Sequence, residues 1–391
     1  MRPTLYVAMV DDWELRGNGS GNPRQMQFAP MRELVRIYGE EGILSTFMVE
    51  VMQQLTFRKF QDQHPELREL ADEWDEIVLE TYSKGHDVQL HIHSQWYGAR
   101  FENGGWVLPG HWQITRYDES TAREMLVAGK DYLQSLLRRI NPEYRCVAYR
   151  AGAWCLAPSE YMIRLLSEIG IDLDISMAAG LRFRTRHVEL DYTKCEESFL
   201  PFFPAVSDAR RVADNSAPLV CVPTNQFTAG IFNTMRWRVR NKILRRVRAT
   251  HIPTSSNHAK PADKATHRLG DWDDICRQNL RGRVVDTIRR FCNTHFISDI
   301  AQLDYALLTQ MMQKNRARAR RAGIADMPLV LENHSKDIHN FDDIARFAYD
   351  LARADDIKTV TLSEISGLLR SGKFAIRSQA GFCYISQPQL A

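Results

Sequence analysis

The sequence predicts an α/β fold built on a largely parallel sheet, closed or open, and two patterns indicate this class. Short apolar runs of strand length alternate with amphipathic helical repeats along most of the 391 residues, which is the order of parallel strands joined by helices. Polar and ionisable residues directly follow several of these apolar runs. Because sites gather at the carboxyl ends of parallel strands, these residues indicate where the function lies.

Eight apolar runs predict the strands of this sheet. They cover residues 4–10, 44–49, 87–92, 145–149, 172–176, 218–222, 328–332 and 357–361. Amphipathic repeats predict helices at residues 29–40, 65–82, 119–140 and 158–169. In the third of these helices, Leu126, Leu133 and Leu137 recur at helical spacing, and Asp118 or Ser120 is placed to cap it.

The stretch from 224 to 326 interrupts this alternation. It contains a basic segment, residues 235–248, with seven Lys and Arg side chains. A polar segment at 249–268 and helical patterns at 272–292 and 299–321 follow. We therefore expect a β/α body at 1–223 and 327–372, a helical insertion at 224–326 and a C-terminal extension at 373–391.

Composition favours a cytoplasmic protein. The formal net charge is only +3, so global charge says little about partners. The seven cysteines are odd in number and form no Cys-x-x-Cys pair, which favours reduced thiols over disulfides or a cysteine zinc site. The apolar run near the N-terminus is too short for the core of a signal peptide, and no stretch approaches the roughly 20 apolar residues that span a bilayer.

Two histidines close the predicted strand 87–92. His91 and His93 are two residues apart, so they point to the same side if the strand geometry persists. Two neutral imidazoles at this spacing can form two corners of a metal site. Taken alone, such a pair is more often two ordinary histidines beside a turn, and only further residues favour the metal site.

Carboxylates follow the first predicted strand. Asp12 is the natural third ligand, which leaves a fourth metal position open for water or substrate. Asp11 is a candidate general base, although neighbouring residues on a regular strand point in opposite directions, so this role requires the strand to bend. Glu14, two residues beyond Asp12, is an alternative for either acidic role.

Two other strand ends supply the remaining candidates. Arg150 follows the strand at 145–149 and is suited to hold a catalytic carboxylate in its ionised form. His334 follows the strand at 328–332 and is a candidate general acid that protonates a leaving nitrogen. Together with the earlier residues, these placements favour a metal-dependent hydrolase.

Five segments resemble motifs of the polysaccharide deacetylase family, in the order that the family has them. They are Val10 to Asp12, Gly85 to His91, Tyr149 to Trp154, Asp172 to Ser176 and Leu331 to His334. The resemblance implies a distorted (β/α) barrel of about seven strands, here with an inserted basic helical segment. It also implies a divalent metal, most commonly zinc, and hydrolysis of an N-acetyl amide on a sugar.

Carried over by position, the resemblance implies Asp11 as base, Asp12 and His91 as metal ligands, Arg150 as the orienting partner of the base and His334 as acid. The family's usual His-x-x-x-His spacing would place the second histidine at Gln95, whereas this sequence has His93. Leu90 to Trp96 looks like a branch with His-x-His, and Asp12 to Glu14 resembles the Asp-x-Glu of that branch. The roles of Asp11, Asp12 and Glu14 relative to one another therefore stay open.

The sequence also suggests substrates and partners. Trp96 and Trp154 are candidates to stack on a sugar ring, although the aromatic residues after the histidine pair can equally pack on one another. The expected substrate is an N-acetylated sugar, a sugar nucleotide or a lipid-linked sugar of surface polysaccharide, lipopolysaccharide or amino-sugar metabolite synthesis. Residues 235–248 suit an anionic membrane surface, an acidic glycan, nucleic acid or plain solvent. The alternative hypotheses are a catalytically inactive glycan-binding barrel and a protein that binds nucleic acid or a membrane surface. No sequence pattern indicates the oligomeric state.

Overall fold

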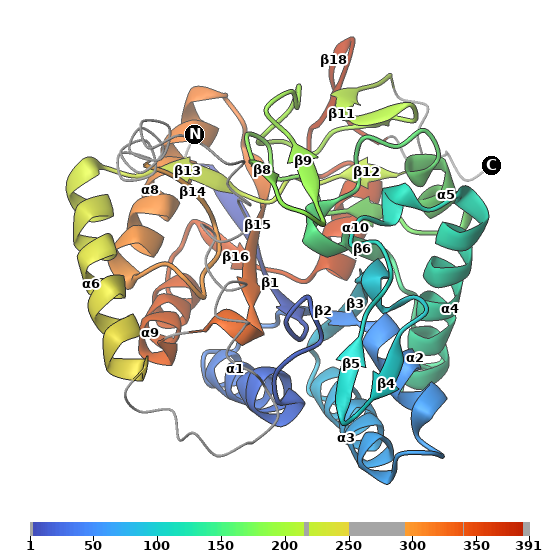
Figure 1. The fold of residues 1–391 in the computed structure, drawn as a ribbon. Coiled ribbons are helices and arrows are strands. Elements are labelled where there is room, and N and C mark those ends of the chain that lie inside the picture. Colours follow the sequence, from blue (N-terminus) through green and yellow to red (C-terminus); the bar gives the residue numbers. More distant parts are fainter. Residues whose placement is uncertain (1–2, 215–218, 250–293, 339, 386–391) are drawn as a thin grey trace, which may run out of the picture.

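The computed structural model describes residues 3–214, 219–249, 294–338 and 340–385. Its centre is a curled parallel sheet that forms a half-barrel, with the strands in the order β12–β7–β6–β3–β2–β1–β15 and β16 paired to β1 (Figure 1). The strands are β1 Thr4–Trp13, β2 Thr46–Glu50, β3 Asp87–Ile92, β6 Ala148–Ala151, β7 Leu173–Asp174, β12 Val220–Cys221, β15 Asp326–His334 and β16 Ile357–Thr359. The predicted α/β fold with a distorted barrel is confirmed, and every predicted strand has its counterpart in this sheet.

Strand β1 is the spine of the half-barrel. It pairs with β15 without a break, from Thr4 opposite Asp326 to Asp12 opposite His334. At the open side of the sheet, Asn225 donates its backbone N–H to the Val330 carbonyl of β15 at 3.0 Å. This contact brings the chain that follows β12 beside β15, and so curls the sheet toward closure.

Side chains along β1 alternate between two apolar clusters, as the period of a strand requires. Tyr6, Ala8 and Val10 belong to the cluster inside the half-barrel, and the residues between them belong to the cluster under the surrounding helices. Trp13 continues the outer series. Residues Asp12 and Glu14 therefore lie on the inner side.

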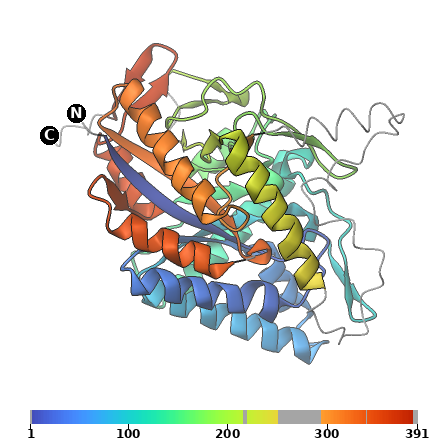
Figure 2. The ribbon, with the colours of Figure 1, turned by 90° about the vertical axis from the view of Figure 1, so that its left-hand side faces the viewer.

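Most helices cover the outside of the sheet, whereas α10 contributes Leu362, Ile365 and Leu369 to the inner cluster. Figure 2 shows α8, α9 and α1 side by side along it. The helices are α1 Ala29–Glu40, α2 Val51–Phe60, α3 Pro65–Ser83, α4 Glu119–Leu137, α5 Met162–Glu168, α6 Ile231–Ala249, α8 Tyr305–Arg321, α9 Phe341–Ala352 and α10 Leu362–Arg370. Among the described helices, none combines the length and the apolar character needed to cross a membrane.

Two helices begin later than the sequence patterns predict. The Ser159 hydroxyl accepts from the N–H of Met162 at 3.2 Å in a turn that precedes α5, whose N-cap residue Tyr161 makes no side-chain cap. Asp304 accepts from the N–H of Leu307 at 3.0 Å, so α8 starts at Tyr305 and the residues from 299 to 304 form a loop.

Short hairpins and turns complete the described chain. The paired short strands are β4 Arg100–Glu102 with β5 Gly105–Val107, β8 Arg182–Arg184 with β9 Glu189–Asp191, β10 Pro204–Ala205 with β11 Asp208–Val212, β13 Gln226–Thr228 with β14 His295–Ile297, and β17 Ile376–Ser378 with β18 Gly381–Cys383. The short helical turns are η1 Arg24–Phe28, η2 Ser94–Trp96, η3 Ile114–Arg116, η4 Gly152–Trp154 and η6 Ser335–Asp337.

Part of the expected insertion at 224–326 lies outside the described residues. This holds for the predicted helix at 272–292 and for nearly all of the polar segment at 249–268. Of the rest, α6 packs against α8, and β13 pairs with β14. The division into body, insertion and C-terminal extension stays a prediction.

Candidate functional site

The carboxyl ends of four strands meet at the mouth of the half-barrel and bring the candidate residues together. Asp12 lies near the carboxyl end of β1 with its side chain on the inner face, Arg150 lies in β6, and His334 is the last residue of β15. His91 lies in β3 with its side chain on the same inner face, and His93 follows that strand directly. The rule that parallel strands present functional groups at their carboxyl ends thus holds here.

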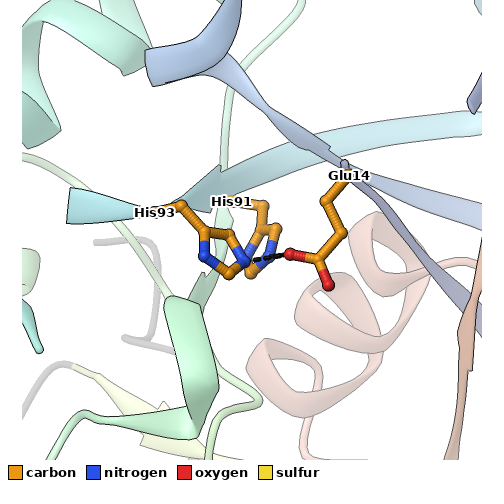
Figure 3. Close-up of side chains that lie close together, drawn as sticks. All are labelled: Glu14, His91 and His93. Atoms are coloured by element: carbon orange, nitrogen blue, oxygen red, sulfur yellow. Dashed lines mark hydrogen bonds and ion pairs between the residues drawn. The ribbon is translucent and has the colours of Figure 1, made fainter. Parts of the chain in front are cut away.

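Glu14, His91 and His93 form a buried triad with the geometry of a metal site (Figure 3). Their ligand atoms all lie within 4.8 Å of one another. Nε2 of His91 is 3.3 Å from Oε2 of Glu14, and Nε2 of His93 contacts the same oxygen. The two imidazole rings are 4.6 Å apart and nearly perpendicular, so their nitrogens converge on one point from different directions.

Contacts behind the triad prepare these residues to bind a cation. Nδ1 of His91 lies 2.9 Å from the Arg150 carbonyl, which can only accept, so Nδ1 carries the proton and Nε2 keeps its lone pair. Nζ of Lys336 contacts Oε1 of Glu14 and leaves Oε2 to the imidazoles. The backbone N–H of His93 donates to the buried Glu50 carboxylate at 2.9 Å, which fixes the chain there.

The electrostatics of the triad suit metal ligands. Burial alone would raise the pKa of Glu14, but the contact with His93 and the charge of Lys336 bring that pKa well below its usual value. Burial lowers the pKa of His93, which favours the neutral ring. An ionised carboxylate and two imidazoles are a donor set that zinc accepts, with further positions left for water or substrate. The residues present therefore fit a divalent cation.

Asp12 lies between two cationic groups beside the triad. Its Oδ1 is 3.6 Å from Nε of Arg150, and its Oδ2 is 3.6 Å from Nε2 of His334. Among the described residues, none donates a hydrogen bond to the buried Oδ1. His334 also reaches toward the triad, with Nε2 3.9 Å from Oε1 of Glu14. Asp12 is therefore placed to accept a proton from a group bound at the mouth.

Arg150 is completely buried and anchors the other side of the site. Its Nη1 donates to Oε2 of Glu332 at 2.9 Å, and the indole N–H of Trp154 donates to the same oxygen at 3.0 Å. Burial would lower the pKa of Arg150, but the charges of Asp12 and Glu332 raise it above its usual value. The guanidinium thus keeps its charge and holds a fixed position beside Asp12.

Asp299 holds His334 from behind. Its Oδ2 lies 3.3 Å from Nδ1 of His334, which turns Nε2 toward Asp12. Burial would lower the pKa of His334, but the adjacent carboxylate of Asp299, with the charge of Asp12, raises it to about 10. The ring therefore carries two protons at neutral pH, the form that a general acid needs.

Asp299, Glu332 and His334 also have ligand atoms within 4.8 Å of one another. A doubly protonated imidazole cannot ligate a metal, and Glu332 already binds Arg150. The geometry therefore favours an ion-pair network for this group.

Asp11 lies on the opposite face of β1 from the triad. It stands opposite Asn333 in the sheet register, and its carboxylate accepts a hydrogen bond from the Asn333 side chain. The carboxyl group of Asp11 also lies near Tyr38 in α1, under the outer helices. The expected role of Asp11 as base required a bend in the strand, but β1 pairs regularly with β15 at this position, so Asp11 points to the other face while staying within electrostatic range of Asp12 and His334.

The two candidate tryptophans differ in their surroundings. Trp96 is only 3% exposed and packs edge-on against Phe57 and Trp106, so its faces are covered by other rings. Trp154 is half-buried, and its ring centre lies 5.5 Å from that of His334. Of the two, only Trp154 borders the site.

The backbone around Trp154 is held in an uncommon conformation. Ala153 and Trp154 have φ values of 51° and 57°, in the left-handed region that non-glycine residues rarely adopt. Gly152 precedes them, and a Cβ there would lie 2.7 Å from the Ile92 carbonyl oxygen and 3.1 Å from Cα of His93. This turn therefore packs directly on the histidine segment.

Reasoning from sequence missed Glu332, Asp299 and Lys336. Glu332 could have been predicted, because it precedes His334 by two residues on a predicted strand, the same spacing that indicated His91 and His93. Asp299 fell within a predicted helix, and no sequence pattern connects it to His334.

Comparisons with known proteins give low similarity. No protein-family model and no curated protein matches the sequence. Among solved structures, the chain is similar to a Mycobacterium smegmatis protein described as a polysaccharide deacetylase, with 15% identity, a TM-score of 0.48, and coverage of 100% of this chain and 96% of that chain. It is also similar to Puue allantoinase, with 11% identity, a TM-score of 0.47 and coverage of 95% and 91%.

A Pseudomonas aeruginosa PAO1 protein, also described as a polysaccharide deacetylase, has 11% identity, a TM-score of 0.47 and coverage of 94% of this chain and 91% of that chain. Two of the three structures thus bear the name of the family that the sequence motifs resemble. At this similarity they carry no argument about activity, which rests on the residues of this chain.

Proposed function

We propose that this protein is a metal-dependent hydrolase that removes an N-acetyl group from an amino sugar. One observation carries the proposal: the buried triad of Glu14, His91 and His93 lies beside the carboxylate of Asp12 and the imidazole of His334. Amide hydrolysis requires these components, namely a cation site, a proton acceptor and a proton donor.

Glu14, His91 and His93 are the residues that would hold the cation, and zinc suits their two nitrogens and one oxygen. What a divalent cation supplies at such a site is Lewis acidity, which polarises an acyl carbonyl and lowers the pKa of bound water. This assignment replaces Asp12 by Glu14 as the carboxylate ligand. The reason is that Glu14 lies against both imidazoles, whereas Asp12 lies between Arg150 and His334.

Asp12 acts in this proposal as the general base in place of Asp11. It accepts a proton from the attacking water, while Arg150 at 3.6 Å orients its carboxylate. The spacing of Asp12 and Glu14 supports the assignment, because residues two apart at a strand end share one face. Base and ligand then point into the same space without a bend in β1.

His334 acts as the general acid. It protonates the amide nitrogen as the carbon–nitrogen bond breaks, which releases acetate and the free amine. Asp299 raises the pKa of His334, which keeps the imidazole protonated, and it directs Nε2 of His334 toward the mouth. Backbone N–H groups of the turn at Gly152–Trp154 are placed beside the histidine segment and are our candidates to stabilise the developing oxyanion.

The substrate we propose is an N-acetylated sugar carried on a nucleotide or a lipid, in the synthesis of a surface polysaccharide, a lipopolysaccharide or an amino-sugar metabolite. Trp154 supports a sugar, because this half-buried indole borders His334 at the mouth and is our candidate to stack on a sugar ring. A cytoplasmic location, which the cysteine content favours, would exclude finished cell wall as the substrate.

The test is acetate release from a panel of N-acetylated monosaccharides, sugar nucleotides and lipid-linked sugars, with and without a chelator. The proposal expects release from at least one member of the panel, loss of release with chelator and its return when zinc is added. Release that persists in chelator would contradict metal dependence. Release of no acetate from any member, by protein loaded with metal, would contradict the deacetylase assignment.

A further inference from the structure

Helix α6 carries an exposed apolar stripe. Phe232, Met235 and Val239 are 86%, 41% and 61% exposed, and their spacing of three and four residues places them on one face of the helix. With the neighbouring Ile231 they account for four of the ten large apolar side chains that are exposed among residues whose burial the structure describes. Scattered exposed apolar residues are ordinary, but such concentration within nine residues marks an interaction surface.

The stripe points away from the part of the protein that the structure describes. The opposite face of α6 holds it in place: the indole N–H of Trp237 donates to the Gln302 carbonyl at 2.7 Å, and the Asn233 side chain donates to Gln310 at 3.2 Å. Thr234 on this face is completely buried. Figure 1 places α6 at the left edge of the molecule, and in Figure 2 it lies on the side facing the viewer.

The segment Ile231–Ala249 is also strongly basic. It contains seven Lys and Arg residues and no Asp or Glu, in a chain whose net charge is only +3. Arg236 is bound to Asp304 at 3.1 Å, and Arg240 to Asp343 at 2.8 Å. Even with both pairs formed, the sequence of this segment keeps more basic than acidic side chains.

We propose that α6 docks the protein on an anionic membrane surface, with Phe232, Met235 and Val239 inserted at the level of the lipid headgroups. A helix with an apolar face and basic flanks suits this interface, because the apolar side chains leave water while the cations meet anionic lipid headgroups. Nucleic acid would neutralise the same charges but would leave the exposed phenylalanine in water. A second copy of the helix would bring two basic segments together, which is unfavourable.

The docking helix is joined to the candidate site. It is fixed to the loop at 299–304 through Trp237 and Arg236, and this loop begins with Asp299, the partner of His334. In combination with the proposed function, this arrangement suits an N-acetylated sugar attached to a membrane lipid. The docking itself rests only on α6, so its test does not depend on catalysis.

The test is sedimentation of the full-length protein with vesicles of phosphatidylcholine alone or with about 30 mol% phosphatidylglycerol. Binding is expected only with the anionic vesicles, and it should weaken when NaCl rises from about 0.1 M to about 0.5 M. The Phe232→Ser, Val239→Ser double variant should lower the partition coefficient at least about tenfold, since each buried apolar side chain contributes to insertion. Its melting temperature should not change, because both side chains are exposed.

The matched control is Phe382→Ser, since Phe382 is 56% exposed in β18, on a different element. This variant should bind anionic vesicles like the wild type. Absence of wild-type binding to anionic vesicles at about 0.1 M NaCl would overturn the proposal. Equal vesicle binding by the double variant and the wild type would also overturn it. The same holds if the double variant changes only from dimer to monomer, or loses only oligonucleotide binding.

Discussion

Asp299 and His334 form a carboxylate–imidazole pair at the mouth of the half-barrel, with Oδ2 3.3 Å from Nδ1. The pair joins two segments that are 35 residues apart, a loop before α8 and the end of β15. Its consequence is chemical, because it keeps the imidazole protonated and turns Nε2 toward Asp12. A histidine that is neutral in most proteins at pH 7 is thereby prepared as an acid.

Replacing Asp299 by asparagine should lower deacetylation about 10- to 100-fold. Burial would lower the pKa of His334, and Asp299 is the main group that raises it to about 10. Without that charge the pKa falls, so the alkaline limb of the pH–rate profile should move to lower pH. Asp304→Asn in the same loop is the control, since Asp304 caps α8 and binds Arg236. An unchanged alkaline limb in the Asp299 variant would show that Asp299 does not control the pKa of the general acid.

Asp12→Asn and Asp11→Asn should separate catalysis from structure. Asp12 lies between Arg150 and His334, so its loss should lower kcat at least about 100-fold. Asp11 lies on the outer face, where burial raises its pKa well above the usual value, so an uncharged asparagine should keep activity within a few-fold. Steady-state kinetics with folded protein measures both. A loss of kcat in the Asp11 variant as large as in the Asp12 variant would contradict the reassignment of the base.

Lys336→Gln should weaken metal binding without abolishing it. The ammonium group contacts the oxygen of Glu14 that faces away from the imidazoles, and its charge helps to keep the pKa of Glu14 low. Groups that orient a ligand in this way change metal affinity by about 10- to 100-fold. Competition with a chromophoric chelator measures the affinity. Equal affinity in variant and wild type would mean that Lys336 serves another purpose.

His86 should make folding stability sensitive to acid. Burial, with the charge of Lys84, lowers the pKa of His86 to about 4, and Nδ1 accepts from the N–H of Ser45 at 3.2 Å. Between pH 6.5 and 4, His86 is protonated in the unfolded chain but stays neutral in the folded chain. The contribution of neutral His86 to the free energy of unfolding is therefore present at neutral pH and lost as pH falls. Its loss amounts to about 2 kcal/mol.

Urea denaturation at pH 7 and pH 4.5 tests this. The difference in unfolding free energy between the two pH values should be smaller in His86→Asn, whose side-chain oxygen can still accept from Ser45. An equal difference in both proteins would assign the acid sensitivity to other groups.

The strands could be predicted because each overlaps an apolar run; β1 and β15 extend further than predicted, whereas β7, β12 and β16 are shorter than their runs. Helix α2 escaped prediction because its buried face includes Gln53 and Gln54, and because its cap is the glutamate Glu50. Capping by a carboxylate that also holds the His93 backbone is a tertiary arrangement, which no local pattern reveals.

The period of a strand predicted more of the site than the motif resemblance did. Residues two apart share a face at the ends of two strands, which brings together His91 with His93, and Asp12 with Glu14. The same rule places Asp11 on the outer face, where the structure has it. Asp299 could not be predicted, since its contact with His334 depends on how the chain after residue 224 returns to the mouth.

The account depends most on whether the triad of Glu14, His91 and His93 holds a cation, and the metal content of the purified protein measures this directly. Elemental analysis should find about one divalent ion per chain in the wild type and in His111→Ala, an exposed histidine outside the triad. The His91→Ala, His93→Ala double variant, shown to be folded by circular dichroism, should contain almost none. A metal-free wild type from zinc-supplemented growth, or a double variant that keeps its ion, would contradict the account.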